Sequence, residues 1–185
     1  RSRWHLPMND SLRVRPAWEA DAEGIAQIYN HYIAHSTATF EESPVTARDI
    51  AGRMASVRAA GFDWLVAVGD EREDEAASLQ GYAYSAPWNG RSAYRFSSEV
   101  TAYIAIDSLG KGVGTQLYQA LFAQLRARGQ HTVMAGIALP NVASVALHEK
   151  FGMHQVAHYQ QVGFKFEQWI DVGYWQVLLD NEGEP

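Results

Sequence analysis

The sequence predicts a single domain of the α/β class. The chain has 185 residues, close to the length of one ordinary domain, and 47% of them are hydrophobic, which is enough for a sizeable core. Apolar residues recur at helical spacing in some segments and alternate with polar residues in others. A strand also runs through a glycine-rich turn into a helix, and an apolar strand follows. This last arrangement predicts a strand–helix–strand unit with a right-handed crossover.

The first half of the chain predicts two helices and three strands. Acidic Glu19, Asp21 and Glu23 near the start of the first helix suit the positive end of its dipole. Thr46 and Asp49 indicate a capping box at the start of the second. The expected elements, in order, are a strand at residues 12–16, a helix whose apolar stripe runs from Ile25 to Ile33, a helix with a stripe of Ile50, Met54 and Val57, and paired strands at residues 62–68 and 80–86. Residues 69–78 are expected to form a mobile charged loop.

The second half predicts two helices and four strands, after an aromatic loop at residues 87–96. The expected elements are a strand at residues 98–106, a helix with a stripe of Val113, Leu117, Leu121 and Leu125 that Gly129 ends, a strand at 132–139, a short helix at 142–151, and aromatic-rich strands at 155–166 and 169–179. Because residues 132–139 are almost continuously apolar, we expect that strand to be covered on both faces.

Composition excludes several classes of protein. The formal net charge of −6 disfavours a general nucleic-acid binder, which would carry a basic face. No run of about 18 uncharged apolar residues exists, so no membrane span is expected. Because Met8 follows a short polar stretch, residues 1–7 are expected to be an expression remnant, and residues 8–185 one domain.

The chain contains no cysteine. Disulfides and thiolate metal sites are therefore absent, and a cytoplasmic location is expected. The seven histidines show no paired ligand spacing, so we expect no metal site. Any acyl transfer must also proceed without a cysteinyl intermediate, which favours direct attack on a bound donor.

The most informative turn is Gly110-Lys111-Gly112-Val113-Gly114. Glycines permit a close approach of ligand to backbone, and the N–H groups that begin the next helix form an anion site. We therefore expect the turn to hold the pyrophosphate of a nucleotide-type cofactor. A Walker A loop is excluded because Gly112, rather than Ser or Thr, follows Lys111. A dinucleotide fingerprint is disfavoured because the helix lacks the third glycine, and a turn that needs its glycines for geometry alone stays open.

Other short segments stand in a distinctive order around this turn: residues 28–33, 36–40, 64–67, 81–83, 87–88, 141–153, 163–166 and 169–176. The set resembles the GNAT superfamily of N-acetyltransferases over nearly the whole chain after Leu12. Within that superfamily it is most similar to the phosphinothricin and methionine sulfoximine N-acetyltransferases. The resemblance implies a mixed, largely antiparallel twisted sheet of about seven strands, a splayed parallel pair of its fourth and fifth strands, and about four flanking helices.

The resemblance also implies acetyl-CoA as the acetyl donor. The residues that would bind it are Ala102, Tyr103, Ile104, Gly110, Lys111, Gly112, Val113, Gly114, Thr115 and Asn141. The chain departs from the family where Leu109 and Gly110 replace polar side chains at the turn, and where Ile170 replaces histidine. Phosphate binding is therefore expected to rest on backbone N–H groups, with Lys111 as a solvated side chain or a further contact.

Two residues are candidates for catalysis. Strand alternation places Glu99 on the face of Thr101 and Tyr103, and the resemblance gives this position a catalytic carboxylate that accepts a proton from the amine. An ion pair of Glu99 with Arg91 or Arg95 is the structural alternative. His148 stands where most of the superfamily has a tyrosine acid. It is expected to protonate the leaving thiolate, to orient Glu99 or bind substrate, or to pack.

The acceptor is expected to be an amino-acid-like amine of the phosphinothricin, methionine sulfoximine or methionine sulfone type. The resemblance implicates Phe40, Arg91, Tyr94 and Lys165 in binding it, since a cation suits a carboxylate or phosphinate. Two alternatives stay open, namely another amine class such as a protein N-terminus or polyamine, and an acyl-CoA-binding module without turnover. The many aromatic residues also favour a homodimer. No nucleic acid or membrane partner is expected.

Overall fold

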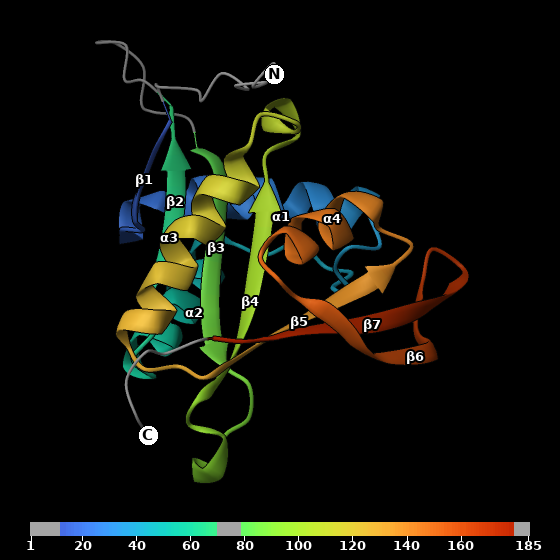
Figure 1. Cartoon of the computed structure of the whole chain (residues 1–185). Helices are drawn as coiled ribbons and strands as arrows, with labels where there is room; N and C mark the ends of the chain where they lie inside the picture. The colour runs from blue at the N-terminus through green and yellow to red at the C-terminus, as the bar shows by residue number, and fades with distance from the viewer. Residues whose placement is uncertain (1–11, 70–78, 180–185) are drawn as a thin grey trace, which may run out of the picture.

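The computed structural model describes residues 12–69 and 79–179 (Figure 1). The described strands are β1 (Arg13–Pro16), β2 (Trp64–Val68), β3 (Leu79–Pro87), β4 (Ser97–Ile104), β5 (Thr132–Leu139), β6 (His154–Lys165) and β7 (Gln168–Leu178). The helices are α1 (Ala22–His35), α2 (Ala47–Ala59), α3 (Val113–Ala127) and α4 (Val142–Lys150), with short 3-10 turns at Glu19–Asp21, Ser92–Tyr94 and Ile106–Ser108. The expected leading segment 1–7 and most of the expected charged loop, residues 70–78, lie outside the described residues.

The strands form one sheet in the order β1-β2-β3-β4-β5-β7-β6. Every neighbouring pair is antiparallel except β4 and β5, which are parallel. The predicted mixed sheet of seven strands with four helices is confirmed. The parallel pair is short, because only Ser97–Glu99 lie in register with Thr132–Met134. Beyond Glu99 the two strands diverge, and this splay positions the functional site.

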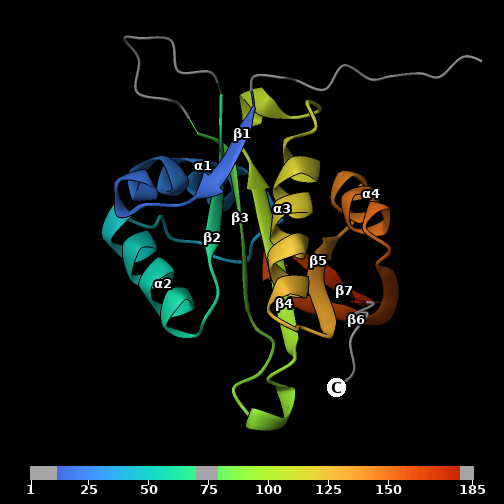
Figure 2. The same ribbon diagram turned by 60° about the vertical axis from the view of Figure 1, so that its left-hand side comes forward.

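Two hydrophobic clusters hold the helices on opposite faces of the sheet (Figure 2). On one face, α1 and α2 pack on Trp64, Val66 and Tyr82. On the other, α3 packs on Leu65, Ala83 and other inward side chains of β2 to β5. β2 is buried along its whole length, since helices cover both of its faces. This two-sided burial makes the β1–β4 half of the sheet a rigid support for the splay.

Local sequence signals explain several element boundaries. The predicted capping box of α2 is present, with Asp49 N–H donating to Thr46 Oγ1 at 3.1 Å and Thr46 N–H donating to Asp49 Oδ2 at 2.8 Å. The acidic cluster before α1 differs from the prediction. Glu19 and Asp21 lie in a 3-10 turn, where Asp21 forms an ion pair with Arg15 at 2.7 Å. Of the three acids, Glu23 is the one in the first turn of α1.

β5 corrects another expectation. Its residues are not covered on both faces: Val133, Ala135 and Ile137 are buried, whereas Gly136 between them is exposed and Met134 and Ala138 are half-buried. The continuous apolar sequence therefore misled the prediction. The exposed face of β5 lines two cavities beside the splay through Gly136 and Ala138, and is not packed under a helix as the buried face is. β4 also ends at Ile104, two residues before the predicted end. No helix among the described residues has the length and apolar character needed to cross a membrane.

Candidate active site

The splay leaves part of the backbone of β4 without a strand partner. Ala105 N–H donates to Gln80 O at 2.9 Å, so alternate residues of β4 direct their main-chain groups toward β3. By this alternation Tyr103 is paired with β3, while Ala102 and Ile104 direct theirs toward the splay. The Ile104 carbonyl accepts a hydrogen bond from the Tyr32 hydroxyl. The predicted backbone contacts come from Ala102, Tyr103 and Ile104. The N–H and carbonyl of Ala102 and the N–H of Ile104 face the opening, whereas the backbone groups of Tyr103 face β3.

A cavity of about 500 Å³ lies along this opening, and we call it the cofactor cavity. Its walls come from β4, β5, α4 and the segment after α1. The lining residues are Tyr32, Ser36, Thr37, Ala38, Val100, Thr101, Ala102, Tyr103, Ile104, Leu109, Tyr118, Gly136, Ile137, Ala138, Pro140, Asn141, Ala143, Ser144, Leu147 and His148. Asn141 and His148 both line it, as their seven-residue spacing predicts. Asn141 also caps α4, because its Oδ1 accepts from Ser144 N–H at 3.1 Å.

The glycine turn lies at the start of α3. Gly110 and Gly112 have φ of 72° and 78°, in the left-handed region that side chains disfavour. Gly112 is the N-cap of α3 and no side chain caps it, so the first N–H groups of the helix are available to an anion. Lys111 is exposed, and Lys150 Nζ donates to Thr115 Oγ1 at 3.1 Å. These groups fit a pyrophosphate.

The other two predicted turn residues, Val113 and Gly114, present no side chain to a ligand at the turn. Val113 is buried in the cluster under α3. Gly114 lies so close to α4 that a Cβ added to it would come within 3.1 Å of the Leu147 side chain. Gly114 therefore permits the close packing of α3 on α4.

A second cavity of about 480 Å³ lies on the exposed face of β5, and we call it the acceptor cavity. Its lining residues are Ala38, Phe40, Glu99, Gly136, Ala138, Tyr159, Val162, Val172 and Tyr174. It shares Ala38, Gly136 and Ala138 with the cofactor cavity, so the two cavities meet at the splay. The lining is apolar and aromatic, with Glu99 as its one charged side chain.

Glu99 lies at the start of the splay and is half-buried. Burial raises the pKa of its carboxyl group, and a hydrogen bond from the Gly136 backbone N–H opposes that shift. No arginine or lysine within residues 12–69 and 79–179 forms an ion pair with Glu99. Arg95 instead donates to Ser92 O at 3.2 Å and stacks on Phe96. Glu99 is therefore a partly desolvated carboxylate that faces a cavity. Among the described residues, the alternative ion pair with Arg91 or Arg95 does not form.

His148 is buried, with 6% of its surface exposed. Nδ1 lies 2.6 Å from the Ser144 carbonyl oxygen, and Nε2 lies 2.9 Å from the Tyr118 hydroxyl. Burial lowers the pKa of His148, and the bond to the Ser144 carbonyl partly offsets this effect. Both ring nitrogens of His148 therefore have partners, Ser144 and Tyr118, and neither partner is Glu99.

The four residues expected to bind the acceptor lie in different places. Phe40 lines the acceptor cavity, and its ring packs against β6 so closely that a Cβ on Gly163 would come within 2.3 Å of it. Arg91 and Tyr94 are exposed in the loop between β3 and β4 and line neither cavity. Lys165 is 2% exposed, and its Nζ donates to the carbonyls of residues 36 and 39 at 2.8 Å each. Within one chain, Phe40 is the member of the set that reaches the cavity.

Comparisons with known proteins agree with this geometry. Residues 14–173 match the family model described as acetyltransferase (GNAT) domain. The chain belongs to the GNAT acetyltransferases. It is 36% identical to a phosphinothricin N-acetyltransferase of Streptomyces coelicolor, over 94% of this chain and 100% of that protein. It is 38% identical to an L-methionine sulfoximine/L-methionine sulfone acetyltransferase of Pseudomonas aeruginosa, over 92% and 96%.

Among solved structures, the GNAT chain is similar to a phosphinothricin acetyltransferase of Sinorhizobium meliloti in complex with acetyl-CoA. The TM-score is 0.84, with 31% identity over 91% of this chain and 89% of that one. The predicted family is therefore confirmed, and the relatives include the predicted phosphinothricin and methionine sulfoximine N-acetyltransferases.

Tyr118, Tyr174 and Gly136 are among the cavity-lining residues that sequence reasoning missed. Tyr118 of α3 is fully buried and lines the cofactor cavity. Tyr174 of β7 covers Gly136, whose added Cβ would lie 3.0 Å from the tyrosine ring. A tyrosine inside an apolar helical stripe is a signal that could have found Tyr118, because a buried hydroxyl needs a partner. The sequence has no such signal for Gly136, because this residue lines the cavities only where β5 diverges from β4.

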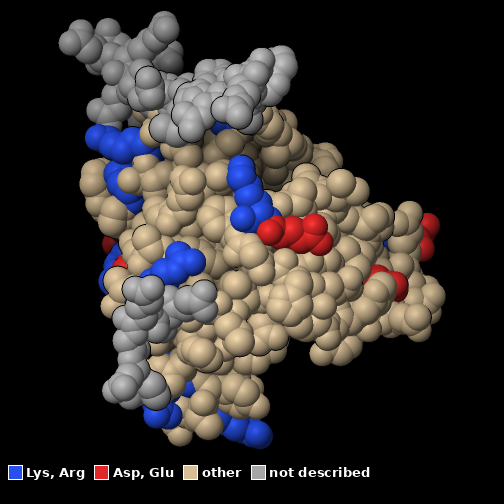
Figure 3. All heavy atoms as spheres, viewed as in Figure 1, with Lys and Arg blue, Asp and Glu red and all other residues tan. Residues whose placement is uncertain are grey.

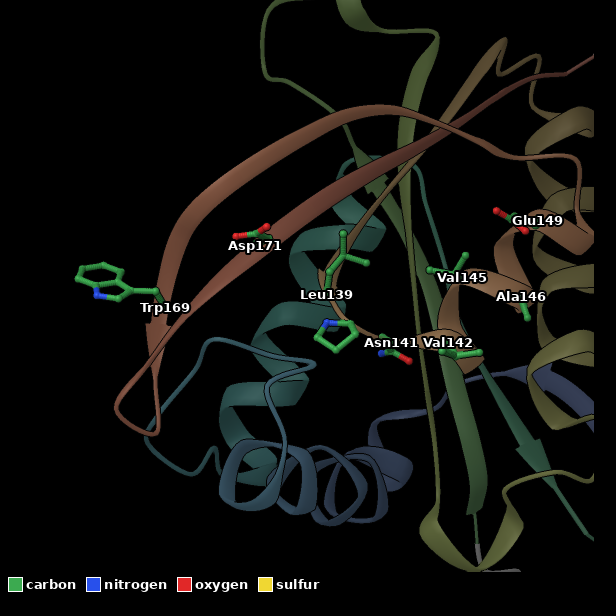
Figure 4. A pocket seen from close by; sticks show the side chains of 9 residues that line it. Leu139, Asn141, Val142, Val145, Ala146, Glu149, Trp169 and Asp171 are labelled. Atoms are coloured by element: carbon green, nitrogen blue, oxygen red, sulfur yellow. The ribbon is translucent and has the colours of Figure 1, made fainter.

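A third hollow, of about 700 Å³, lies between α4 and β7 (Figure 4). Pro140, Asn141 and the exposed Val142 and Trp169 are among its lining residues. Of these four, Pro140 and Asn141 also line the cofactor cavity. Neither candidate catalytic residue lines it, so we do not assign it to the active site. In the part of the chain that the structure describes, no three histidine or acidic side chains gather in a group that could hold a metal ion.

Proposed function

We propose that this protein transfers the acetyl group of acetyl-CoA directly to the α-amine of an amino-acid-like substrate within a ternary complex. The acceptor is of the phosphinothricin, methionine sulfoximine or methionine sulfone type. The observation that carries the proposal is the position of Glu99. Its partly buried carboxylate lines the acceptor cavity at the end where that cavity meets the cofactor cavity.

Glu99 is the proposed proton acceptor. An α-amine in water is mostly protonated at neutral pH, so the site must remove a proton before nitrogen can attack. The raised pKa of Glu99 makes its carboxylate a better base than an exposed one, and the Gly136 N–H holds the carboxylate in place. His148 lines the cofactor cavity and not the acceptor cavity, and we propose that it acts near the leaving thiol.

Acetyl-CoA would supply the activated acetyl group when bound. The free N–H and carbonyl of Ala102 and the N–H of Ile104 are suited to bind an amide-bearing chain as an added strand. An N–H at this edge would also stabilise negative charge on a carbonyl oxygen. The turn from Gly110 to Thr115 is the proposed site for the pyrophosphate, through backbone N–H groups and the exposed Lys111.

The acceptor cavity favours a short amine with an apolar body. Phe40, Tyr159, Val162 and Tyr174 give it aromatic and aliphatic walls. A polyamine would call for several carboxylates, and Glu99 stands alone in this lining. The relatives named for phosphinothricin and methionine sulfoximine act on acceptors of the proposed kind. Arg91 and Lys165 stay proposed cationic contacts of the acceptor's acidic group, and Tyr94 a proposed aromatic contact, all to be tested by substitution.

We also propose that the chain works as a homodimer in the cytoplasm. The location rests on the lack of cysteine. The dimer rests on an apolar surface at the β6–β7 end, where few charged side chains are visible on the face shown in Figure 3. Its exposed large side chains include Val156, Tyr159, Val162, Phe164 and Trp169. Light scattering coupled to gel filtration measures the mass of the native assembly.

Thiol release from acetyl-CoA tests the activity. The purified protein is offered methionine sulfone, methionine sulfoximine, phosphinothricin, spermidine and an alanine-starting peptide, and mass spectrometry identifies the product. Turnover is expected with the first three. Turnover with spermidine or the peptide alone would reassign the acceptor class, and cofactor binding without turnover on any amine would refute the enzymatic proposal.

A further inference from the structure

A hydrogen-bonded chain of three residues borders the cofactor cavity. Tyr118 of α3 meets His148 Nε2 at 2.9 Å, and His148 Nδ1 meets the Ser144 carbonyl at 2.6 Å. All three residues line the cofactor cavity. Tyr118 is fully buried, and its ring also contacts the His148 ring edge-on, with centroids 5.2 Å apart. These hydrogen bonds thus link α3 to α4 at the wall of the cofactor cavity where we expect the thiol end of the acetyl donor.

The partners determine where the protons lie. A backbone carbonyl only accepts hydrogen bonds, so His148 Nδ1 must carry a proton directed at Ser144. In the neutral ring Nε2 is then a lone pair, and the Tyr118 hydroxyl is its donor. Burial lowers the pKa of His148 and raises the pKa of Tyr118 well above its usual range, so both side chains are neutral near pH 7.

We infer that Tyr118 is a positioning residue of the acetyl-transfer reaction, which acts by fixing the ring plane of His148 through the hydrogen bond to Nε2, while the Ser144 carbonyl fixes the Nδ1–H tautomer. The inference rests on the proposed function. It also changes the role expected for His148. The neutral ring has no proton to offer directly to a leaving thiolate, because its one proton is held by Ser144.

The other groups around the pair do not supply such a donor. Phe122 and Phe151 pack on the Tyr118 ring, with centroids at 5.7 and 5.6 Å. The charged or titratable groups that influence the Tyr118 hydroxyl are Tyr84, Glu99 and Tyr103, all on the sheet. The hydroxyl is therefore the one donor that the described structure directs at Nε2. Replacing Tyr118 with phenylalanine keeps the ring packing and removes this donor alone.

The test combines kinetics with the tautomer of His148. Steady-state rates are measured with methionine sulfone for the unsubstituted protein, Tyr118→Phe, His148→Phe and the double variant. Loss of the positioning bond is expected to lower kcat about 10- to 100-fold in Tyr118→Phe. The KM for acetyl-CoA should change by less than about threefold, because the pyrophosphate and backbone contacts are untouched. The double variant should be no slower than His148→Phe, since the two residues act as one unit.

Nitrogen-15 chemical shifts of the imidazole provide the second readout, which a merely structural role would not move. Nδ1–H is expected in both the unsubstituted protein and Tyr118→Phe, because the Ser144 carbonyl is kept, whereas the Nε2 shift should change in Tyr118→Phe because its lone pair loses a donor. Tyr82→Phe removes a hydroxyl from another buried tyrosine, outside both cavities, and is the matched control. It should leave kcat and the His148 shifts unchanged.

The contrary results separate a failure of this inference from a failure of the proposed function. An unchanged kcat in Tyr118→Phe, losses that multiply in the double variant, or an Nε2–H tautomer in the unsubstituted protein would overturn the inference while the proposed function stands. Absence of turnover by the unsubstituted protein on every amine would refute both.

Discussion

The two cavities that meet at the splay are built in different ways. The cofactor cavity and the turn beside it offer mainly backbone groups, from Ala102 and Ile104 on β4 to the uncapped start of α3. The acceptor cavity is shaped by side chains, with the Phe40 and Tyr174 rings around the Glu99 carboxylate. Backbone recognition would tolerate substitution as long as the turn keeps its shape, which is consistent with Leu109 and Gly110 at positions where the family resemblance implies polar side chains. Recognition by side chains should be sensitive to single changes.

The largest expected effect is on the acceptor side. Glu99→Gln keeps the shape of the side chain and removes the base. The value of kcat/KM for methionine sulfone should fall about 100- to 10,000-fold, the usual range for loss of a general base. The KM for acetyl-CoA should stay near its original value if the two cavities are independent. A loss confined to acetyl-CoA binding would contradict the assignment of Glu99.

Gly163→Ala tests the aromatic wall. The added Cβ would lie 2.3 Å from the Phe40 ring, so the ring must move out of its place in the acceptor cavity. The KM for the acceptor should rise about tenfold, equivalent to about 1.4 kcal/mol of lost binding. Gly52→Ala is the matched control, because an added Cβ there meets nothing within 4 Å. Equal effects of the two changes on the acceptor KM would mean that Phe40 does not shape the site.

Lys165→Met separates two roles for a buried cation. If Lys165 secures the segment after α1, its loss removes hydrogen bonds to the carbonyls of residues 36 and 39. The protein should then lose about 1–3 kcal/mol of stability, the cost of leaving buried polar groups unpaired. Denaturant unfolding measures this change. If Lys165 binds the substrate's acidic group instead, the acceptor KM rises and stability is unaffected.

The buried carboxyl of Glu99 should also affect stability through pH. Because the pKa of Glu99 is raised in the folded state, protonation favours folding. That contribution is present below the unfolded pKa, near 4.5, and is lost as pH rises through the folded value. Glu99→Gln should therefore raise Tm at pH 7.5 by about 2–4 °C per kcal/mol gained, and by nothing near pH 4. An equal Tm difference at both pH values would argue against a desolvated carboxyl.

The smallest effect is expected at the turn. Lys111→Ala removes an exposed cation but no backbone N–H, so the KM for acetyl-CoA should rise about two- to threefold at low salt. The rise should vanish near 0.5 M salt, since screening weakens a surface charge. A larger, salt-independent loss would show that the side chain, rather than the backbone, carries phosphate recognition.

Some of the active site could be predicted from the sequence. Alternation along β4 placed Glu99 and Tyr103 on one face, and the structure packs Tyr103 against α1 on that face. The spacing of Asn141 and His148 placed both on one cavity wall. The hydrogen-bond partners of Lys165 could not be predicted, because they lie 129 and 126 residues away in the chain.

The sequence by itself determined the features that depend on near neighbours in the chain: the capping box at Thr46, the left-handed glycine turn before α3, and the strand–helix–strand unit. The tertiary structure alone decided that β5 opens on one face and that Tyr118 meets His148 across 30 residues. The physical reason is the range of the interactions. Backbone angles and helix or strand periodicity are local, whereas burial and hydrogen-bond partners depend on which elements pack together.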